Sequence, residues 1–333
     1  MQTNSIYEKF KNLTQSNADA SAFNVITVPN TKHKLGVSCE GYPKFFVSTN
    51  ESATSSTNMT REILTVQYNL PCTIIENGDK QYSNNFSIIT LQALEKQLQI
   101  YFIDIFVMML EKLPPIPSKR VLSIEIENII TIFSALKSKP IKEIQGLWAE
   151  LLVIEQSLHP ETLIAAWHSQ PNAKYDFTMG RDKIEVKSTS AEERIHRFAL
   201  DQLNPSPNSR LLIASVIVRE SAEGTGGLSL HNLYDRICNR VTVVNSRLKL
   251  YSTLVATIGS DYTKFDNVFF DHVAASDSLA FFDVKVVPHI KKSDVPEFVS
   301  DVKFSSNLSH LIDIRNSDSD FNYADSPLFK SLF

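Results

Sequence analysis

Over the first third of the chain, short apolar runs alternate with turn-forming residues, which is typical of β-strands joined by tight connections. The pattern predicts strands over 23–28, 35–38, 44–48, 63–68, 72–76 and 85–91. Asn77 and Gly78 lie between the last two runs and predict a hairpin turn. A short amphipathic helix is expected before the strands, within residues 1–20.

Helical periodicity follows the strands, over 91–113, 118–137 and 141–158. Pro114 ends the first of these helices, and Pro140 separates the second from the third. The apolar run 100–110 contains Asp104 and is too short to cross a bilayer, so we expect a buried helix there. The change in pattern predicts a β-rich N-terminal domain with a trailing helix over 1–115 and a second domain over 116–333.

The second domain is expected to contain helices and strands in mixed order. After the helix at 141–158, the pattern favours strands at 163–167, 175–179 and 183–188, a helix at 192–203 and a strand at 211–218. A helix at 228–244 and further helix and strand segments follow. The order αβββαβ predicts an α/β (α+β) fold class.

Composition describes an ordinary globular protein, with 43% hydrophobic and 21% charged residues in 333. The formal net charge of −4 argues against a protein that coats nucleic acid non-specifically, but it is compatible with a binding groove that is locally basic. Cys39, Cys72 and Cys238 form no CxxC pair, so free thiols in a reducing cytoplasm are expected. The first residues lack the basic and apolar stretches of a signal peptide.

Candidate chemistry gathers where two expected strands follow one another. Asp176 lies in the run 175–179, and Glu185 and Lys187 lie in the run 183–188. Because side chains alternate along a strand, Glu185 and Lys187 point to the same face. If the two strands pair as a hairpin, Asp176 reaches that face as well. Two carboxylates and an ammonium then share one small volume.

Two neighbouring carboxylates repel each other unless a positive charge lies between them. A hard divalent cation suits that position, so we expect Mg²⁺, with Mn²⁺ as a substitute, bound by Asp176 and Glu185. A metal-bound water of lowered pKa is suited to phosphodiester hydrolysis, and Lys187 is expected to orient it. The alternative is a set of solvated charges, since a Glu-x-Lys triplet occurs by chance about once in a chain this long.

Four segments in order resemble the PD-(D/E)XK nuclease superfamily, and more specifically a bacterial family of such proteins from restriction and phage-defence gene clusters: 146–152 (GLWAELL), Asp176, 185–187 (EVK) and 194–203 (RIHRFALDQL). Tyr175 stands where the superfamily name has proline. The resemblance implies a restriction-endonuclease-like core. It also implies a catalytic and metal-binding role for Glu150, a Gln202 that points toward the active site and contacts DNA, and products with 5′-phosphates.

Further polar residues follow the expected catalytic strand. On the expected helix 192–203, Arg194 and Arg197 face outward, where they would bind DNA phosphates; the alternative is a solvated helix of mixed charge. On that helix Ile195, Phe198, Ala199 and Leu203 would share the packed face. Ser188 is expected either to donate to a phosphate or to cap the helix.

The sequence contains no GxxxxGK[ST], HExxH or GxSxG motif, so it offers no signal for nucleotide hydrolysis, a zinc protease or a serine hydrolase. We expect a metal-dependent endodeoxyribonuclease in restriction or anti-phage defence, cytoplasmic, without a membrane partner. DNA is its expected partner, and it acts as a homodimer or with other subunits of a defence system. The alternatives are a catalytically silent nuclease-fold subunit, an unrelated α+β interaction protein, and cleavage of RNA.

Overall fold

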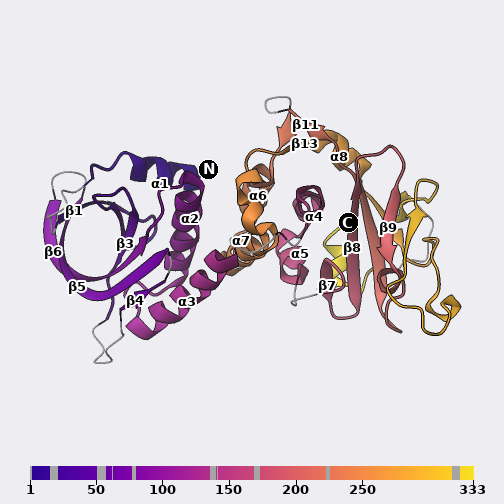
Figure 1. Cartoon of the computed structure of the whole chain (residues 1–333), viewed down its shortest axis with the longest axis horizontal. Helices are drawn as coiled ribbons and strands as arrows, with labels where there is room; N and C mark the ends of the chain where they lie inside the picture. Colours follow the sequence, from indigo (N-terminus) through magenta and orange to yellow (C-terminus); the bar gives the residue numbers. More distant parts are fainter. Residues whose placement is uncertain are drawn as a thin grey trace. The chain divides into compact units, whose positions relative to one another are not determined.

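The computed structural model of the chain describes residues 2–15, 22–50, 58–61, 63–76, 80–135, 140, 142–168, 173–222, 226–316 and 323–333. The chain divides into two compact units, residues 1–134 and 135–333 (Figure 1). The sequence-based domain boundary at 115/116 refers to parts of the chain that would fold independently. It therefore stays a prediction.

Five strands of the first unit close into a barrel, which appears as a ring in Figure 1. Their order is β1, β2, β3, β6, β5, all antiparallel, and β5 also pairs in parallel with β1 to complete the ring. The bounds are β1 Ala22–Thr27, β2 Lys34–Val37, β3 Pro43–Val47, β5 Leu64–Glu76 and β6 Lys80–Leu91; the short β4, Met59–Thr60, pairs with β5. The two strands expected at 63–68 and 72–76 are therefore one strand, interrupted only by a register shift between Gln67 and Leu70. The predicted Asn77-Gly78 turn lies outside the described residues.

Three helices complete the first unit: α1 (Gln2–Lys11), α2 (Lys96–Lys112) and α3 (Lys119–Ala135). The ring centroid of Phe45 on β3 lies 5.5 Å from that of Phe102 and 5.2 Å from that of Phe106, both on α2. Phe102 also contacts Phe133 of α3, at 6.1 Å between centroids. The apolar run 100–110 is thus a buried helix, as predicted, because it packs between the barrel and α3.

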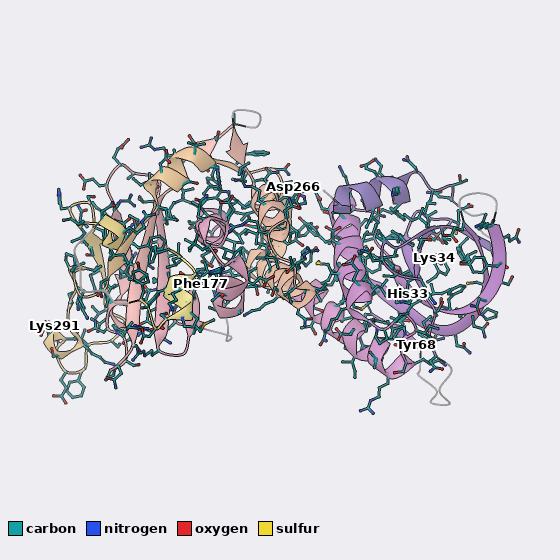
Figure 2. The ribbon with its side chains drawn as sticks, turned by 180° about the vertical axis from the view of Figure 1, so that it is seen from behind. His33, Lys34, Tyr68, Phe177, Asp266 and Lys291 are labelled. Carbon is teal, nitrogen blue, oxygen red and sulfur yellow. The ribbon has the colours of Figure 1, made fainter. Side chains whose placement is uncertain are left out.

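His33 lies in the first unit just before β2 (Figure 2), and its burial is expected to make this unit sensitive to acid. The side chain is 1% exposed, and among the described residues neither ring nitrogen has a hydrogen-bond partner. Burial lowers the pKa of His33 to about 4, against about 6.5 in an unfolded chain. The unfolded chain therefore binds more protons between these values, and the free energy of unfolding falls as the pH drops from about 6.5 to about 4.

On going from about pH 7 to about pH 4.5, we expect the free energy of unfolding to fall less for His33→Phe than for the wild type. The difference between the two losses should be no more than about 3 kcal/mol. The measurement is urea unfolding followed by far-UV circular dichroism at about pH 7 and about pH 4.5. His196, whose pKa burial also lowers to about 4, contributes in the same pH window and remains in both proteins. An equal acid loss in the two proteins would contradict the assignment to His33.

A four-stranded sheet forms the centre of the second unit, in the order β14, β10, β8, β7. The strands are β7 (Phe177–Met179), β8 (Asp182–Thr189), β10 (Arg210–Ile217) and β14 (Ala280–Asp283); β8 and β10 are parallel and the other pairs antiparallel. Helix α4 (Ile144–Gln156) packs on β8 and on α6 (Leu230–Cys238). Trp148 of α4 is fully buried and donates to the Leu228 carbonyl at 2.9 Å, so it is part of the core.

Two segments of the second unit differ from the sequence-based expectation. Residues 163–167, expected as a strand, lie largely in helix α5 (Pro160–Ala166), which begins with proline in its first turn. Residues 192–203, expected as a helix, form strand β9 (Ile195–Ala199) and the 3₁₀ helix η1 (Leu200–Leu203). β9 pairs with β15 (Lys303–Asn307), a partner more than a hundred residues away, and this pairing overrides the local helical preference. The prediction that these apolar residues share one packed helix face is therefore wrong. Phe198 and Leu203 are buried, but Ile195 is 49% exposed.

The remaining elements of the second unit are α7 (Val244–Ile258), η2 (Gly259–Lys264), α8 (His272–Ser278), η3 (Lys292–Asp294), η4 (Ile314–Asn316) and α9 (Pro327–Lys330), with the small sheet β11 (Glu220–Ser221), β13 (Phe269–Asp271) and β12 (Gly227–Leu228). The helix expected over 228–244 is thus α6, which ends at Cys238. Cys39, Cys72 and Cys238, all among the described residues, form no disulfide bond. Among the described residues, no helix is both long and apolar enough to span a bilayer.

Candidate metal and catalytic site

The hairpin of β7 and β8 brings the first two predicted site residues together. Phe177 pairs with Ile184, so the register carried back by one residue sets Asp176 opposite Glu185. The backbone N–H of Val186 donates to Asp176 Oδ2 at 2.7 Å and holds that carboxylate against β8. Asp176 is 4% and Glu185 3% exposed. The predicted hairpin is therefore confirmed, but its acids are buried instead of lying at a solvated edge.

Helix α4 adds a third buried carboxylate, Glu150, which is 1% exposed. Trp167 Nε1 donates to Glu150 Oε2 at 2.7 Å, and His168 Nε2 lies 2.9 Å from the same oxygen. One ligand atom each from Glu150, His168 and Asp176 lie within 4.8 Å of one another, a spacing that could hold a metal ion. The sequence had pointed to Glu150 and Asp176 but not to His168. A lone histidine after a short helix carries no spacing signal, and only the fold brings it to the two acids.

Lys142 is the second residue that sequence reasoning missed. Its ammonium donates to Glu150 Oε1 and to Asp176 Oδ1, so a single positive charge lies between the two carboxylates. The side chain is 29% exposed, compared with 2% for that of Glu150 and 6% for that of Asp176. The ammonium of Lys142 thus lies between carboxylates that the sequence predicts to bind a metal ion.

The three buried carboxylates lie close together, and two of them have raised pKa values. Burial raises the pKa of Asp176 to about 6, and repulsion by Glu150 adds to that shift. Burial also raises the pKa of Glu185 to about 8, with repulsion by Asp176 as the second cause. For Glu150, burial would raise the pKa, but the hydrogen bond from His168 and the charge of Lys142 outweigh it and leave the pKa below its usual range. Buried acids with raised pKa values are typical of functional sites.

Beside the acids, Glu185, Lys187 and Gln202 form a connected group. Lys187 Nζ lies 2.9 Å from Glu185 Oε1 and donates to Gln202 Oε1 at 3.2 Å, while the Gln202 amide donates to Glu185 Oε1. Among the described residues, Glu185 Oε2 is buried without a hydrogen-bond partner. The structure thus joins Lys187 and Gln202 to Glu185 as expected, and it leaves one buried carboxylate oxygen available for a ligand.

The other predicted DNA-contacting residues lie in different surroundings. Arg194 is partly buried and donates to the carbonyl and hydroxyl of Ser215, both at 2.9 Å, and to the Ser278 carbonyl. Arg197 is exposed on β9. Ser188 Oγ accepts from Gln145 Nε2 at 3.2 Å. Contact of these side chains with DNA stays a prediction, and Arg197 has the most freedom to make it.

Comparison with known protein families shows to which family the chain belongs. The profile of the family described as "Putative PD-(D/E)XK family member (DUF4420)" matches residues 6–309. The chain belongs to this family. Its mixed α/β structure agrees with a PD-(D/E)XK nuclease-like fold, and nuclease activity is the function that the family suggests. Comparisons with curated proteins and with solved structures found no match.

The buried residues fit a divalent cation. Two carboxylates and an imidazole lie within ligand distance of one another, and the ammonium of Lys142 shows that this volume accommodates a positive charge. Carboxylate oxygens suit Mg²⁺ and Mn²⁺, and a neutral imidazole favours transition metals. A donor set that includes His168 therefore suits Mn²⁺ at least as well as Mg²⁺.

Proposed function

We propose that this protein is a metal-dependent endonuclease that hydrolyses DNA phosphodiester bonds with Mg²⁺, for which Mn²⁺ can substitute. The observation that carries the proposal is the buried meeting of Asp176, Glu185 and Glu150 with the Lys187 ammonium, in a chain of the PD-(D/E)XK family. Burying three acids in one place costs several kcal/mol unless cations compensate them. Lys142 and Lys187 bring two positive charges to the three acids, and a bound metal would supply the remaining positive charge.

In this proposal Asp176, Glu185 and Glu150 hold the metal, with His168 as an additional ligand. A bound cation supplies a water of lowered pKa and neutralises charge on the scissile phosphate. Gln202 keeps Glu185 and Lys187 in place through its amide. Lys187 orients the attacking water and stabilises negative charge on the phosphate.

The biological setting follows the family resemblance. We propose a role in restriction or anti-phage defence in the cytoplasm, with products that carry 5′-phosphates. Cutting both strands of a duplex requires two active sites, which a homodimer or a complex with other defence subunits would supply.

The proposal is tested by incubating supercoiled plasmid with the purified chain and Mg²⁺ or Mn²⁺, with EDTA as the metal-free control. We expect nicked and linear products with either metal and none with EDTA. Asp176→Asn keeps the shape of the side chain but removes its charge, and it should abolish cleavage. Glu192→Gln, at a side chain 87% exposed, is the matched control and should cleave like the wild type.

Binding of Mn²⁺, measured by isothermal titration calorimetry, separates the two parts of the proposal. We expect Asp176→Asn to weaken Mn²⁺ binding at least tenfold. A chain that binds Mn²⁺ through these acids but cleaves no DNA, alone or with its neighbouring gene products, would favour the catalytically silent subunit.

A further inference from the structure

The two-stranded ribbon of β9 and β15 presents two different faces. His196 and Phe198 of β9 are buried, whereas Arg197 between them is exposed. On β15 Lys303 and Ser305 are exposed, and Ser306 is buried. Because Arg197 pairs with Ser305 and Ala199 pairs with Lys303, these exposed residues share the outer face.

A groove of about 520 Å³ lies along this outer face. It is lined by residues of the ribbon, of η1 and of the segment before Asp176: Lys174, Arg197, Phe198, Ala199, Asp201, Gln202 and Lys303. Lys174, Arg197 and Lys303 are exposed, so their charges reach solvent in the groove. The chain therefore builds this surface from three segments that are far apart in the sequence.

The charge of the groove is opposite to that of the whole chain. Three of its lining residues are cations and one, Asp201, is an acid, which gives a local net charge of +2 in a chain of formal net charge −4. Lys292 Nζ lies 3.7 Å from Asp201 Oδ1 and offsets that acid as well. A concentrated positive charge on an acidic protein fits an anionic partner, and proteins hold a phosphate backbone largely through lysine and arginine contacts.

The groove borders the acidic site through Gln202. Gln202 lines the groove, and its side chain bonds both Glu185 and Lys187. Phe198 lines it too, and Lys187 Nζ lies 5.1 Å from the centroid of the Phe198 ring. Lys174 lies two residues before Asp176. An anion in the groove would therefore lie one side chain, that of Gln202, away from the ammonium that we assign to catalysis.

We propose that Lys174, Arg197 and Lys303 form a subsite for the phosphodiester backbone of duplex DNA, next to the scissile phosphate. This inference rests on the proposed function and adds residues to it, since Lys174 and Lys303 carry no motif of their own. Lysine and arginine contacts to phosphates hold DNA without reading its sequence. The subsite thus sets affinity and position, and it leaves sequence recognition to other parts of the protein.

The test measures binding of the full chain to a short fluorescein-labelled duplex by fluorescence anisotropy, in EDTA so that no cleavage occurs. Salt is varied from about 50 to about 200 mM, because each lost phosphate contact lowers the slope of log K against log[salt] by about one unit. The variant Lys174→Ala/Arg197→Ala/Lys303→Ala removes the three charges at exposed positions, and circular dichroism checks its fold. Lys264→Ala removes an exposed cation that does not line the groove.

We expect the triple variant to lose two to three units of slope, as about one unit per contact requires, and Lys264→Ala to lose none. Arg197→Lys should keep the wild-type slope, since a phosphate contact needs only the charge. A folded triple variant with the wild-type slope would overturn the subsite. Plasmid cleavage by the wild type, assayed separately with Mn²⁺, reports on the nuclease itself, so a failed subsite and a failed nuclease give different results.

Discussion

Replacing Lys187 by alanine should slow metal-dependent DNA cleavage by about one hundredfold to one thousandfold, the usual effect of removing one group that stabilises charge in a transition state. The Lys187 ammonium is the cation nearest to Glu185, at 2.9 Å from Oε1, and it is only 19% exposed. No water molecule can replace a fixed positive charge at that position. The measurement is the single-turnover rate of duplex cleavage with saturating Mn²⁺.

Lys183 on the same strand provides the matched control. Lys183→Ala removes an equal charge four residues earlier, on the same face of β8, where the ammonium donates to the Gly180 carbonyl near the turn. It should leave the cleavage rate within about threefold of the wild type, as expected for a surface charge outside the site. Lys187→Ala should not weaken Mn²⁺ binding, because the lysine is no metal ligand here and its loss takes a competing positive charge away from Glu185. A Lys187→Ala protein that cleaves at the wild-type rate would refute the assigned role.

The second large effect is expected from Lys142→Met. Without metal, this change leaves Glu150 and Asp176 buried beside each other with no cation between them. Removing one partner from a buried ion pair typically costs about 3–5 kcal/mol, and the partial exposure of Lys142 places the expected loss near about 3 kcal/mol. Urea unfolding in EDTA measures this loss.

Mn²⁺ should reverse the loss. In the wild type the Lys142 ammonium and a metal compete for the same carboxylate oxygens, so Lys142→Met should bind Mn²⁺ at least tenfold more tightly. At a metal concentration about one hundred times the dissociation constant, binding contributes about 2.7 kcal/mol of stability. Lys264→Met, at an exposed lysine paired with the partly exposed Asp261, should change stability by less than about 1 kcal/mol and should not alter Mn²⁺ binding. A Lys142→Met protein that Mn²⁺ does not stabilise would show that this ammonium does not stand in for a metal.

Much of the fold could be predicted from local patterns alone. Alternating apolar residues identified the barrel strands, the proline-rich breaks bounded α2 and α3, and the run at 100–110 identified a buried helix. Two short apolar runs in succession suggested that 175–179 and 183–188 could pair as a hairpin, which would bring Asp176 to Glu185. The structure has this pairing as β7 and β8, with the turn at Gly180. These features depend on the period of side chains along one strand or helix, which is a property of neighbouring residues.

Only the tertiary structure decided those features that depend on residues far apart in the sequence. Residues 195–199 are a strand because β15 supplies the hydrogen bonds, and no local signal announces a partner so far along the chain. His168 and Lys142 join Glu150 and Asp176 only through the packing of α4 on β8 and the return of the chain after α5. The sequence by itself determined which acids meet across a hairpin. Only the fold determined the lysine and histidine that meet them, because charges from separate segments are brought together by burial of the apolar residues around them.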